Sequence, residues 1–382
     1  MQYVPFGQGG PVSRLGFGCM RLPTVKNGEQ TVIDREKAIA MIRHGIDGGI
    51  TYVDTAYPYH GGESEIVVGL ALKDGYREKV RLTTKLPTWL VNEEQDMNRL
   101  LDEQIKKLDV PYVDFYLLHA MDKDRMAKMR ACHYQDFYRQ AIRDGRIKHA
   151  GFSFHDDKAT FLDILHDFDA WGMCQIQYNF LDDQEQATEE GLREAGRRGV
   201  PVVVMEPLRG GALANPPADV KRFIEEHPSQ RSAVEWAFAY IADYPEVATI
   251  LSGMSTPEQV DDNLRIFDRV TVNGLTNEDR AFIARLKAAY LSRMPIGCTG
   301  CAYCQPCPMN VKIPDIFAGY NASKMFDQPE RLLRRYAYLA GKQEDASQCA
   351  QCGSCEAACP QHLDIIDWLQ KIDREYQAMK TE

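Results

Sequence analysis

Two groups of cysteines near the C-terminal end are the residues of this chain with the clearest chemistry. Eight of the 11 cysteines stand there, in two runs that each hold four cysteines and end in Cys-Pro. A cubane iron–sulfur cluster needs several thiolates that converge from one short loop, and this close spacing supplies them. The spacing predicts two [4Fe-4S] clusters with the ligands Cys298, Cys301, Cys304, Cys307, Cys349, Cys352, Cys355 and Cys359.

The pattern also indicates which cysteine binds which cluster. The second run matches the C-x2-C-x2-C-x3-C-P ferredoxin pattern, and the first run is one residue shorter before its last cysteine. In two-cluster ferredoxins the fourth cysteine of each run binds the other cluster. We therefore expect Cys359 to join the first three cysteines of the first run, and Cys307 to join the first three of the second.

Other uses of these cysteines remain open at this point. Structural zinc is the strongest alternative, although zinc sites usually take paired C-x2-C units that stand well apart. A single cluster is a further alternative, whereas disulfides are disfavoured because nothing else in the chain looks secreted. The other three cysteines, Cys19, Cys132 and Cys174, show no ligand spacing, and we expect them to be reduced structural thiols.

Four further residues have the types that a proton-donating site needs: Asp54, Tyr59, Lys85 and His119. Tyrosine, with a reference pKa of about 10, is a poor acid at neutral pH. A nearby lysine cation lowers that pKa, and a carboxylate keeps the lysine charged and oriented. With a histidine to align the oxygen, such a set suits protonation of the alkoxide that forms when hydride adds to a ketone or aldehyde. Each residue alone has an ordinary structural explanation, so the prediction depends on their joint placement.

The first 290 residues contain the elements that would place them. Eight runs rich in Val, Ile, Leu and aromatic residues alternate with amphipathic, helical stretches, which predicts a (β/α)8 TIM barrel, with a doubly wound sheet as the alternative. The four side chains then lie at the ends of three successive strands, where such barrels hold their chemistry. The strands are expected at 15–22, 50–56, 79–86, 113–119, 147–154, 173–180, 201–207 and 247–254.

The part of the chain with the cysteine runs differs in character. A Pro/Gly junction precedes it, residues 314–346 have the pattern of a helix–turn–helix, and residues 363–380 have that of an amphipathic helix. We therefore predict two domains. Residues 1–292 form the barrel, and residues 293–382 form a C-terminal α-helical domain of the ferredoxin-like 4Fe-4S type.

Composition excludes several classes of function. The formal net charge is −10 and the charges are dispersed, which argues against nucleic acid as a partner. No apolar stretch approaches the roughly 20 residues of a membrane helix, so no membrane partner is expected. The first residues lack the basic start and apolar segment of a signal peptide. With its reduced cysteines, the chain is expected in the cytoplasm.

The barrel part resembles a known family. The segment DTAYPYHGGES, the TTK that ends at Lys85 and the LLH that ends at His119 resemble the aldo-keto reductases over about residues 1–290. With the cysteine runs included, the whole chain resembles the iron–sulfur branch of that family, the ferredoxin-like oxidoreductases. The resemblance implies that Tyr59 is the general acid/base, assisted by Asp54, Lys85 and His119. It also implies that NADP or NAD lies extended across the barrel mouth.

The resemblance carries over positions for that cofactor. They are Gly18, Met20, Ser153, Gln177, Pro207, Leu208, Arg209, Gly210, Gly211, Ser255, Gln259 and Asn263. Three departures from the family pattern concern the same region. Phe154 stands where an asparagine usually holds the nicotinamide carboxamide, and Met205 stands where an aromatic ring often stacks on the nicotinamide. Gly253 and Gln259 stand where many members bind the 2′-phosphate, a role that Arg265 or Arg209 could take.

Three functional hypotheses follow. In the first, the chain is an oxidoreductase that reduces a small carbonyl compound, or oxidises an alcohol, with NAD(P)H, and its clusters exchange electrons with ferredoxin or another redox protein. In the second, the barrel chemistry is the same and the clusters are purely structural. In the third, the chain is a non-enzymatic electron-transfer or redox-sensing subunit, which the four intact catalytic residues argue against. Hydride carries two electrons and a cluster takes one, so direct coupling needs an intermediary such as a flavin, for which no signature is present.

Overall fold

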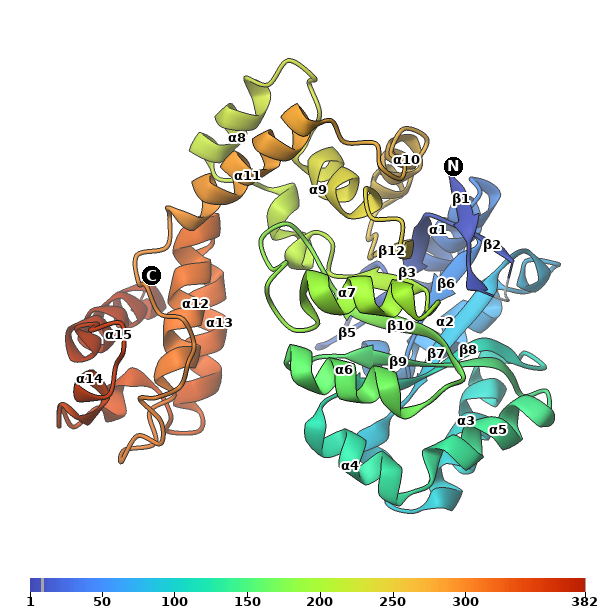
Figure 1. Ribbon diagram of the computed structural model, residues 1–382, viewed down its shortest axis with the longest axis horizontal. Coiled ribbons are helices and arrows are strands. Elements are labelled where there is room, and N and C mark those ends of the chain that lie inside the picture. Colours follow the sequence, from blue (N-terminus) through green and yellow to red (C-terminus); the bar gives the residue numbers. More distant parts are fainter. Residues whose placement is uncertain (8–9, 382) are drawn as a thin grey trace. The chain divides into compact units, whose positions relative to one another are not determined.

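The computed structural model describes residues 1–7 and 10–381 (Figure 1). The chain divides into two compact units. The first holds residues 1–210 and 234–280, and the second holds residues 211–233 and the chain from residue 281 onward. The short internal segment 211–233 therefore groups with the C-terminal part of the chain.

The first unit is a closed barrel of parallel strands surrounded by helices, which confirms the predicted (β/α)8 class (Figure 1). Each strand pairs with the next one along the chain, and the last pairs with the first to close the barrel. The barrel strands are β3 (Leu15–Gly18), β6 (Tyr52–Asp54), β7 (Arg81–Leu86), β8 (Val113–Met121), β9 (Ile147–Phe154), β10 (Trp171–Gln177), β11 (Val202–Met205) and β12 (Val247–Ser252).

Strand alternation divides the side chains between the barrel interior and the outer layer. One buried cluster, to which Tyr52, Leu117 and Met173 belong, fills the interior, and a larger cluster packs the strands against the helices. Residues two positions further along these strands, such as Asp54 and His119, share the interior face near the C-terminal ends. The predicted catalytic residues that lie on strands are therefore placed by the same periodicity that builds the core.

Two short antiparallel hairpins stand outside the barrel and were not predicted. They are β1 (Tyr3–Pro5) with β2 (Pro11–Ser13), and β4 (Thr24–Asn27) with β5 (Gln30–Ile33). The first barrel strand was expected to run to residue 22, but it ends at Gly18 and continues as the 3-10 turn η2 (Cys19–Arg21).

The helices of the first unit follow the predicted alternation. Side-chain caps begin several of them: Asp34 accepts from the Lys37 N–H, and Thr256 accepts from the Gln259 N–H. The helices are α1 (Arg35–Asp47), α2 (Ser64–Ala71), α3 (Glu94–Leu108), α4 (Lys123–Ala131), α5 (Tyr134–Arg143), α6 (Lys158–Asp167), α7 (Thr188–Arg197), α9 (Ala233–Ala242), which begins at the boundary of the unit, and α10 (Pro257–Phe267). Short 3-10 turns are η3 (Tyr59–Gly62), η4 (Arg77–Lys79), η5 (Thr88–Leu90) and η6 (Arg209–Ala214), the last of which runs across the boundary between the units.

The second unit is helical, as predicted for the cysteine-rich part. Its own buried core includes Phe317, Tyr336 and Ile372, and six of the eight cysteines of the two runs pack against that core. The helices are α8 (Ala218–Glu225), most of α11 (Asn277–Leu291), α12 (Ile313–Phe326), α13 (Pro329–Ala340), α14 (Ser354–Ala357) and α15 (Ile365–Thr381), with the 3-10 turn η7 (Ala346–Gln348). The predicted helix–turn–helix is the pair α12 and α13.

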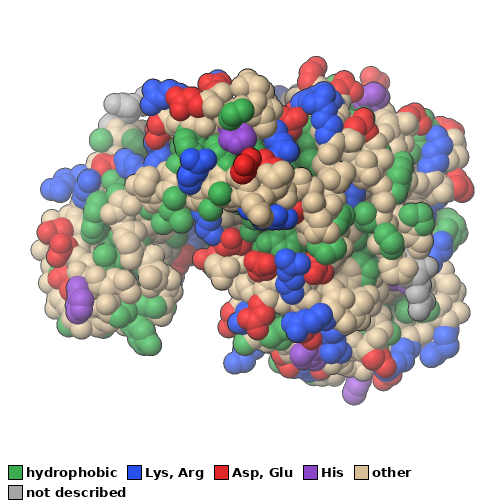
Figure 2. All heavy atoms as spheres, turned by 45° about the horizontal axis from the view of Figure 1, so that its top comes forward, with side chains coloured by type: hydrophobic (Ala, Val, Ile, Leu, Met, Phe, Trp, Pro, Cys, Tyr) green, Lys and Arg blue, Asp and Glu red, His purple; other side chains and the backbone are tan. Residues whose placement is uncertain are grey.

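The surface agrees with the dispersed charges of the sequence. Acidic and basic side chains are mixed over the face drawn in Figure 2. Within residues 1–7 and 10–381, no helix combines the length and the apolar character needed to cross a membrane.

Candidate functional site

The structure brings the four predicted catalytic side chains together at the C-terminal ends of β6, β7 and β8. The Lys85 Nζ donates hydrogen bonds to Asp54 Oδ1 at 2.7 Å and to the Tyr59 hydroxyl oxygen at 3.3 Å. It also donates to the Thr55 carbonyl oxygen at 2.9 Å. The His119 and Tyr59 rings lie 6.1 Å apart in an edge-on arrangement. Because its oxygen accepts from Lys85, Tyr59 keeps its own O–H to donate to a substrate oxygen.

Burial and charge set the protonation of this group. Burial disfavours the Lys85 cation, but Asp54 and then Tyr59 outweigh this effect and raise the pKa of Lys85. For Tyr59, burial raises the pKa of the hydroxyl, and the Lys85 cation only partly opposes it. The sequence-based expectation of a net lowering of the tyrosine pKa is therefore wrong for this structure, because the phenol is largely withdrawn from water.

His119 lies beside Trp89, with ring centroids 5.2 Å apart. Burial lowers the pKa of His119 well below its usual value, and the positive charge of Lys85 lowers it further. The imidazole is therefore neutral at neutral pH. Its Nδ1 is buried and has no hydrogen-bond partner within the described residues.

The predicted nicotinamide contacts lie at neighbouring strand ends. Ser153 is buried near the end of β9, and its hydroxyl oxygen accepts from the Ala120 N–H at 2.8 Å. Its O–H therefore remains available as a donor. Phe154, which replaces the usual asparagine, is fully buried. Gly18 ends β3, and Met20, in η2, is 61% exposed.

Gln177 ends β10 and is held by a buried carboxylate that the sequence did not single out. Its Nε2 donates to Asp182 Oδ2 at 3.3 Å, and its Oε1 accepts from Gln186 Nε2 at 3.0 Å. Asp182 also pairs with Arg209 Nε at 3.2 Å and accepts from Asn179 Nδ2 at 2.9 Å. Arg209 is thus tied to a carboxylate, so it is not the open phosphate group that we expected as a possible substitute.

The loop at 207–211, which holds five of the expected cofactor positions, has a distinctive backbone. Arg209, Gly210 and Gly211 all have positive φ values of 48°, 67° and 93°. Pro207 is buried and Leu208 is partly buried, so they anchor the start of the loop. The first unit ends at Gly210, and Gly211 begins the internal segment of the second unit.

Arg21 is a basic residue at the mouth that sequence reasoning missed. A Cβ added to Gly253 would lie 3.2 Å from Arg21 carbons, and one added to Gly210 would lie 3.2 Å from an Arg21 Nη. Arg21 therefore extends from the loop after β12 to the loop after β11. Among the described residues, no carboxylate pairs with it. Its position directly after Met20, which is one of the expected cofactor positions, could have identified it from the sequence.

Ser255, Gln259 and Asn263, the last three of the expected cofactor positions, do not form one surface. The Gln259 Oε1 accepts from the Ser255 N–H at 2.8 Å, and both residues are exposed or partly exposed. Asn263 is instead buried and donates to Ser252 Oγ at 2.9 Å. Arg265, the other expected phosphate group, pairs with Glu235 and Asp262.

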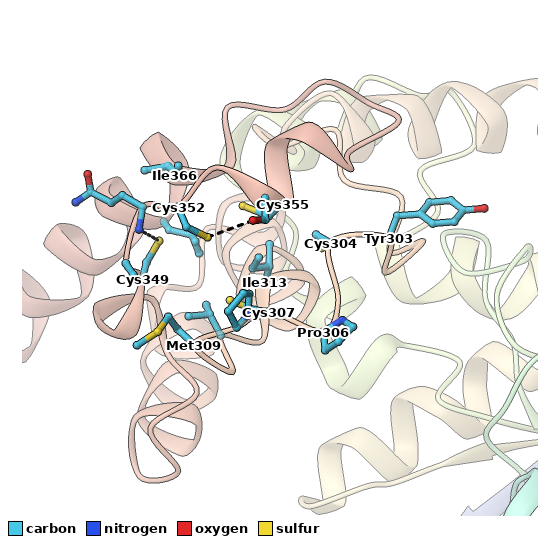
Figure 3. A pocket seen from close by; sticks show the side chains of 16 residues that line it. Tyr303, Cys304, Pro306, Cys307, Met309, Ile313, Cys349, Cys352, Cys355 and Ile366 are labelled. Atoms are coloured by element: carbon cyan, nitrogen blue, oxygen red, sulfur yellow. Dashed lines mark hydrogen bonds between the residues drawn. The ribbon is translucent and has the colours of Figure 1, made fainter.

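The eight cysteines of the runs line two cavities of the second unit. Cys307, Cys349, Cys352 and Cys355 line one of about 80 Å³, whose wall also includes Cys304. Figure 3 shows that these side chains come from two separate loops, while Tyr303 points away from them. The second cavity, of about 20 Å³, is lined by Cys298, Cys301, Cys304 and Cys359. The cavities group the cysteines in the two sets that the crossover rule predicts.

The donor set of each cavity fits an iron–sulfur cluster better than a single ion. Within the described part of the chain, no three His, Cys, Asp or Glu side chains converge as the ligands of one metal ion. In a cubane each thiolate binds a different iron, so the four ligands lie farther apart around the cluster. Five cysteines line the larger cavity and four line the smaller one, with Cys304 in both walls, and these thiols and the mostly uncharged walls agree with that arrangement.

Two family models match separate parts of the chain. Residues 14–273 match the model of the aldo/keto reductase family, and residues 297–366 match that of the 4Fe-4S dicluster domain.

Individual relatives match the barrel part. The "Methylglyoxal reductase YeaE" of Escherichia coli (strain K12) is 37% identical over 267 residues, which cover 61% of this chain and 84% of that protein. The "Probable aldo-keto reductase 1" of Glycine max is 27% identical over 302 residues, or 76% of this chain and 77% of that protein. Among solved structures, aldo-keto reductase AKR11C1 from Bacillus halodurans (holo form) is 27% identical with a TM-score of 0.62, covering 75% of this chain and 96% of that one.

Proposed function

Because this chain belongs to the aldo/keto reductase family, we propose that it reduces a small-molecule carbonyl compound, or oxidises the corresponding alcohol, with NADPH or NADH. The observation that carries this proposal is the contact of Lys85 with both Asp54 and Tyr59 in a largely buried group. In the reducing direction, the nicotinamide supplies hydride to the carbonyl carbon. Tyr59 donates the proton to the carbonyl oxygen, His119 aligns that oxygen, and Lys85 stabilises the tyrosinate that remains.

Several features of the mouth support a phosphate-bearing dinucleotide. Arg21 lies between the loops at Gly210 and Gly253 and has no carboxylate partner among the described residues. A guanidinium can donate two parallel hydrogen bonds to the oxygens of one phosphate group. A structure of an aldo-keto reductase from Klebsiella pneumoniae, 24% identical to this chain with a TM-score of 0.61, is a complex with NADPH, and that likeness supports the fold. Met205, in place of an aromatic ring, and Phe154, in place of asparagine, indicate a modified nicotinamide contact.

We further propose that the C-terminal part of the chain binds two [4Fe-4S] clusters that exchange electrons with ferredoxin or another redox protein. The match to a dicluster domain and the sorting of the eight cysteines into two cavities support this part. In this proposal residues 1–292 carry the carbonyl chemistry, and residues 293–382 carry the clusters. The cubanes supply one-electron transfer, and the packing of cysteines against the core of the unit holds the binding loops in place.

Replacement of Tyr59 tests the carbonyl chemistry. Tyr59→Phe removes the proposed general acid and keeps the ring, so we expect kcat for carbonyl reduction to fall by about 10²–10⁴-fold. Binding of NADPH or NADH, followed by fluorescence, is expected to change little. Tyr112→Phe, the same chemical change directly before the N-terminal end of β8, serves as the control. A Tyr59→Phe variant that turns over at the wild-type rate would exclude this tyrosine as the acid.

A further inference from the structure

Helix α13 has a buried side and an exposed side. Leu332, Tyr336 and Leu339 follow helical spacing and belong to the buried core of the second unit. Arg334 and Tyr338 lie between them in sequence, so they face outward and are exposed. Residues 329–342 contain four basic residues and one acidic residue, in a chain whose formal net charge is −10. Positive charge is therefore concentrated on one side of a helix in an acidic protein.

Cations surround Tyr338 on this exposed side. Tyr338 is 54% exposed, and Arg334 stands one helical turn before it. The guanidinium carbon of Arg335 lies 5.6 Å from the centroid of the tyrosine ring. Lys342 Nζ lies 4.3 Å from the same centroid and donates to the tyrosine hydroxyl oxygen at 2.5 Å. We call these four residues, Arg334, Arg335, Tyr338 and Lys342, the α13 patch.

Little negative charge of the chain balances this patch. Arg335 pairs with Asp315 of α12, and both side chains are partly exposed, so this pair is weak. In residues 1–7 and 10–381, the other two cations of the patch have no carboxylate within ion-pair distance. Glu344 acts on Lys342 only from farther away, and it pairs with Lys312 at 4.0 Å. Positive charge thus remains on the patch for a partner to meet.

The C-terminal end of α13 is joined to both cysteine loops. The Glu344 N–H donates to the Leu339 carbonyl oxygen at 3.0 Å, and the Lys312 N–H donates to the Glu344 carbonyl oxygen at 2.9 Å. Ile313, directly after Lys312, lines both cysteine cavities. Cys349, the first cysteine of the second run, follows Glu344 by five residues. The patch therefore belongs to the helix whose end supports the cysteine loops.

We propose that the α13 patch is the docking face for the redox partner, and that this partner is an acidic protein. Opposite charges steer such a partner to the patch, and tyrosine and arginine are the residues that most often dominate binding at an interface. Nucleic acid fits less well, because the net negative charge of the chain repels a uniform polyanion. A protein with a local acidic surface needs to match only the patch. The inference rests on the proposed electron exchange and assigns to it a face and the charge of the partner.

The test measures how fast a carrier reduces the clusters of the full-length protein. A reduced plant-type ferredoxin, which is a small acidic protein, is mixed with the protein under anaerobic stopped-flow conditions, and bleaching of the cluster absorption is followed. Arg334→Glu with Lys342→Glu is expected to lower the second-order rate constant about 10-fold at low ionic strength. Added salt is expected to slow the wild-type protein toward the rate of this double variant. Arg334→Gln with Lys342→Gln, a milder change, is expected to give an intermediate rate.

Two controls separate docking from other effects. Lys371→Glu with Arg374→Glu makes the same charge change at exposed residues of α15 and is expected to keep nearly the wild-type rate. Reduced methyl viologen, a small cation that needs no docking face, is expected to bleach the clusters of every variant without slowing. Iron content and circular dichroism establish that each variant is folded and loaded.

The outcomes that overturn the inference differ from those that overturn the proposed function. If ferredoxin bleaches both double variants of the α13 patch at the wild-type rate, the inference is overturned while the electron exchange stands. It is also overturned if these variants instead dissociate a wild-type dimer or abolish binding of a labelled DNA duplex, because a second copy or nucleic acid then covers the patch. If methyl viologen bleaches the wild-type clusters and ferredoxin does not, the proposed exchange with ferredoxin falls and the inference falls with it.

Discussion

At the scale of single residues, the catalytic group combines a buried acid with a neutral histidine. Burial raises the pKa of Tyr59 and lowers that of His119, each away from neutral pH. Both groups thus hold one protonation state over a wide pH range. Lys85, whose pKa is raised, keeps its charge over the same range.

This predicts the pH dependence of carbonyl reduction. The rate needs the protonated form of Tyr59, so it is present below the tyrosine pKa and lost as pH rises through it, above about 10. His119 protonates only well below its usual value of 6.5, so kcat is expected to show no inflection near that pH. A kcat profile under saturating substrate checks this, with Tyr59→Phe as the control that lacks the alkaline fall. An inflection near pH 6.5 that His119→Gln removes would show that the histidine titrates normally.

The residues of the site differ in how well the sequence predicts them. Asp54, Lys85 and His119 follow strand periodicity, because a residue at a strand end of a parallel barrel has a defined position. Tyr59 lies beyond the end of β6, in the turn η3. Asp182 and Gln186 were missed because they lie in the loop between β10 and α7. The turns of this loop depend on hydrogen bonds such as those that the Leu181 and Asp182 N–H groups donate to Asn179 Oδ1. The buried hydrogen bond from Asn263 to Ser252 was not predicted either, because it depends on tertiary packing.

At the scale of elements, the two cysteine loops are interleaved. Cys359, at the end of the second run, lines the cavity of the first run, and Cys307 lines that of the second. In the proposed arrangement of two clusters, neither loop completes a cluster by itself. The core residues Ile313 and Ile365 each line a cavity that holds cysteines from both runs, so helix packing and cluster binding support each other.

Paired substitutions distinguish this crossover from two independent loops. Cys298→Ala with Cys359→Ala removes two ligands of one predicted cluster, so iron and sulfide are expected to fall by about half after anaerobic purification. Cys349→Ala with Cys359→Ala removes a ligand from each cluster and is expected to lose most of the iron. Cys132→Ala, at a buried thiol in the barrel unit, is the control with full iron content. The opposite order of iron loss in the two double variants would show that each run binds its own cluster.

The elements outside the barrel pattern were the harder part of the fold to predict. The eight barrel strands and the pair α12 and α13 have strong hydrophobic periodicity. The hairpin of β4 and β5 lies almost entirely on the surface, so its residues show no core pattern. The segment 211–233 groups with a part of the chain far away in sequence, and no local pattern encodes such a contact.

At the scale of the whole molecule, the functions proposed for the two parts of the chain transfer different numbers of electrons. The proposed barrel reaction moves a hydride, which carries two electrons, whereas a [4Fe-4S] cluster accepts one. The chain has the residues for both reactions but shows no flavin signature that would convert one into the other. The two reactions should therefore run independently unless a separate redox protein connects the clusters to a donor.

This independence predicts the outcome of an anaerobic titration of the full-length protein. NADPH alone is expected to leave the visible absorption of the clusters unchanged, while reduced ferredoxin bleaches it. Carbonyl reduction by NADPH should proceed at the same rate with oxidised and with reduced clusters, and Tyr59→Phe should abolish it without altering the bleaching. Clusters that reduced ferredoxin fails to bleach would contradict the proposed electron exchange with that carrier. Bleaching by NADPH alone would contradict the prediction and require a bound two-electron to one-electron converter, which extraction of a flavin would identify.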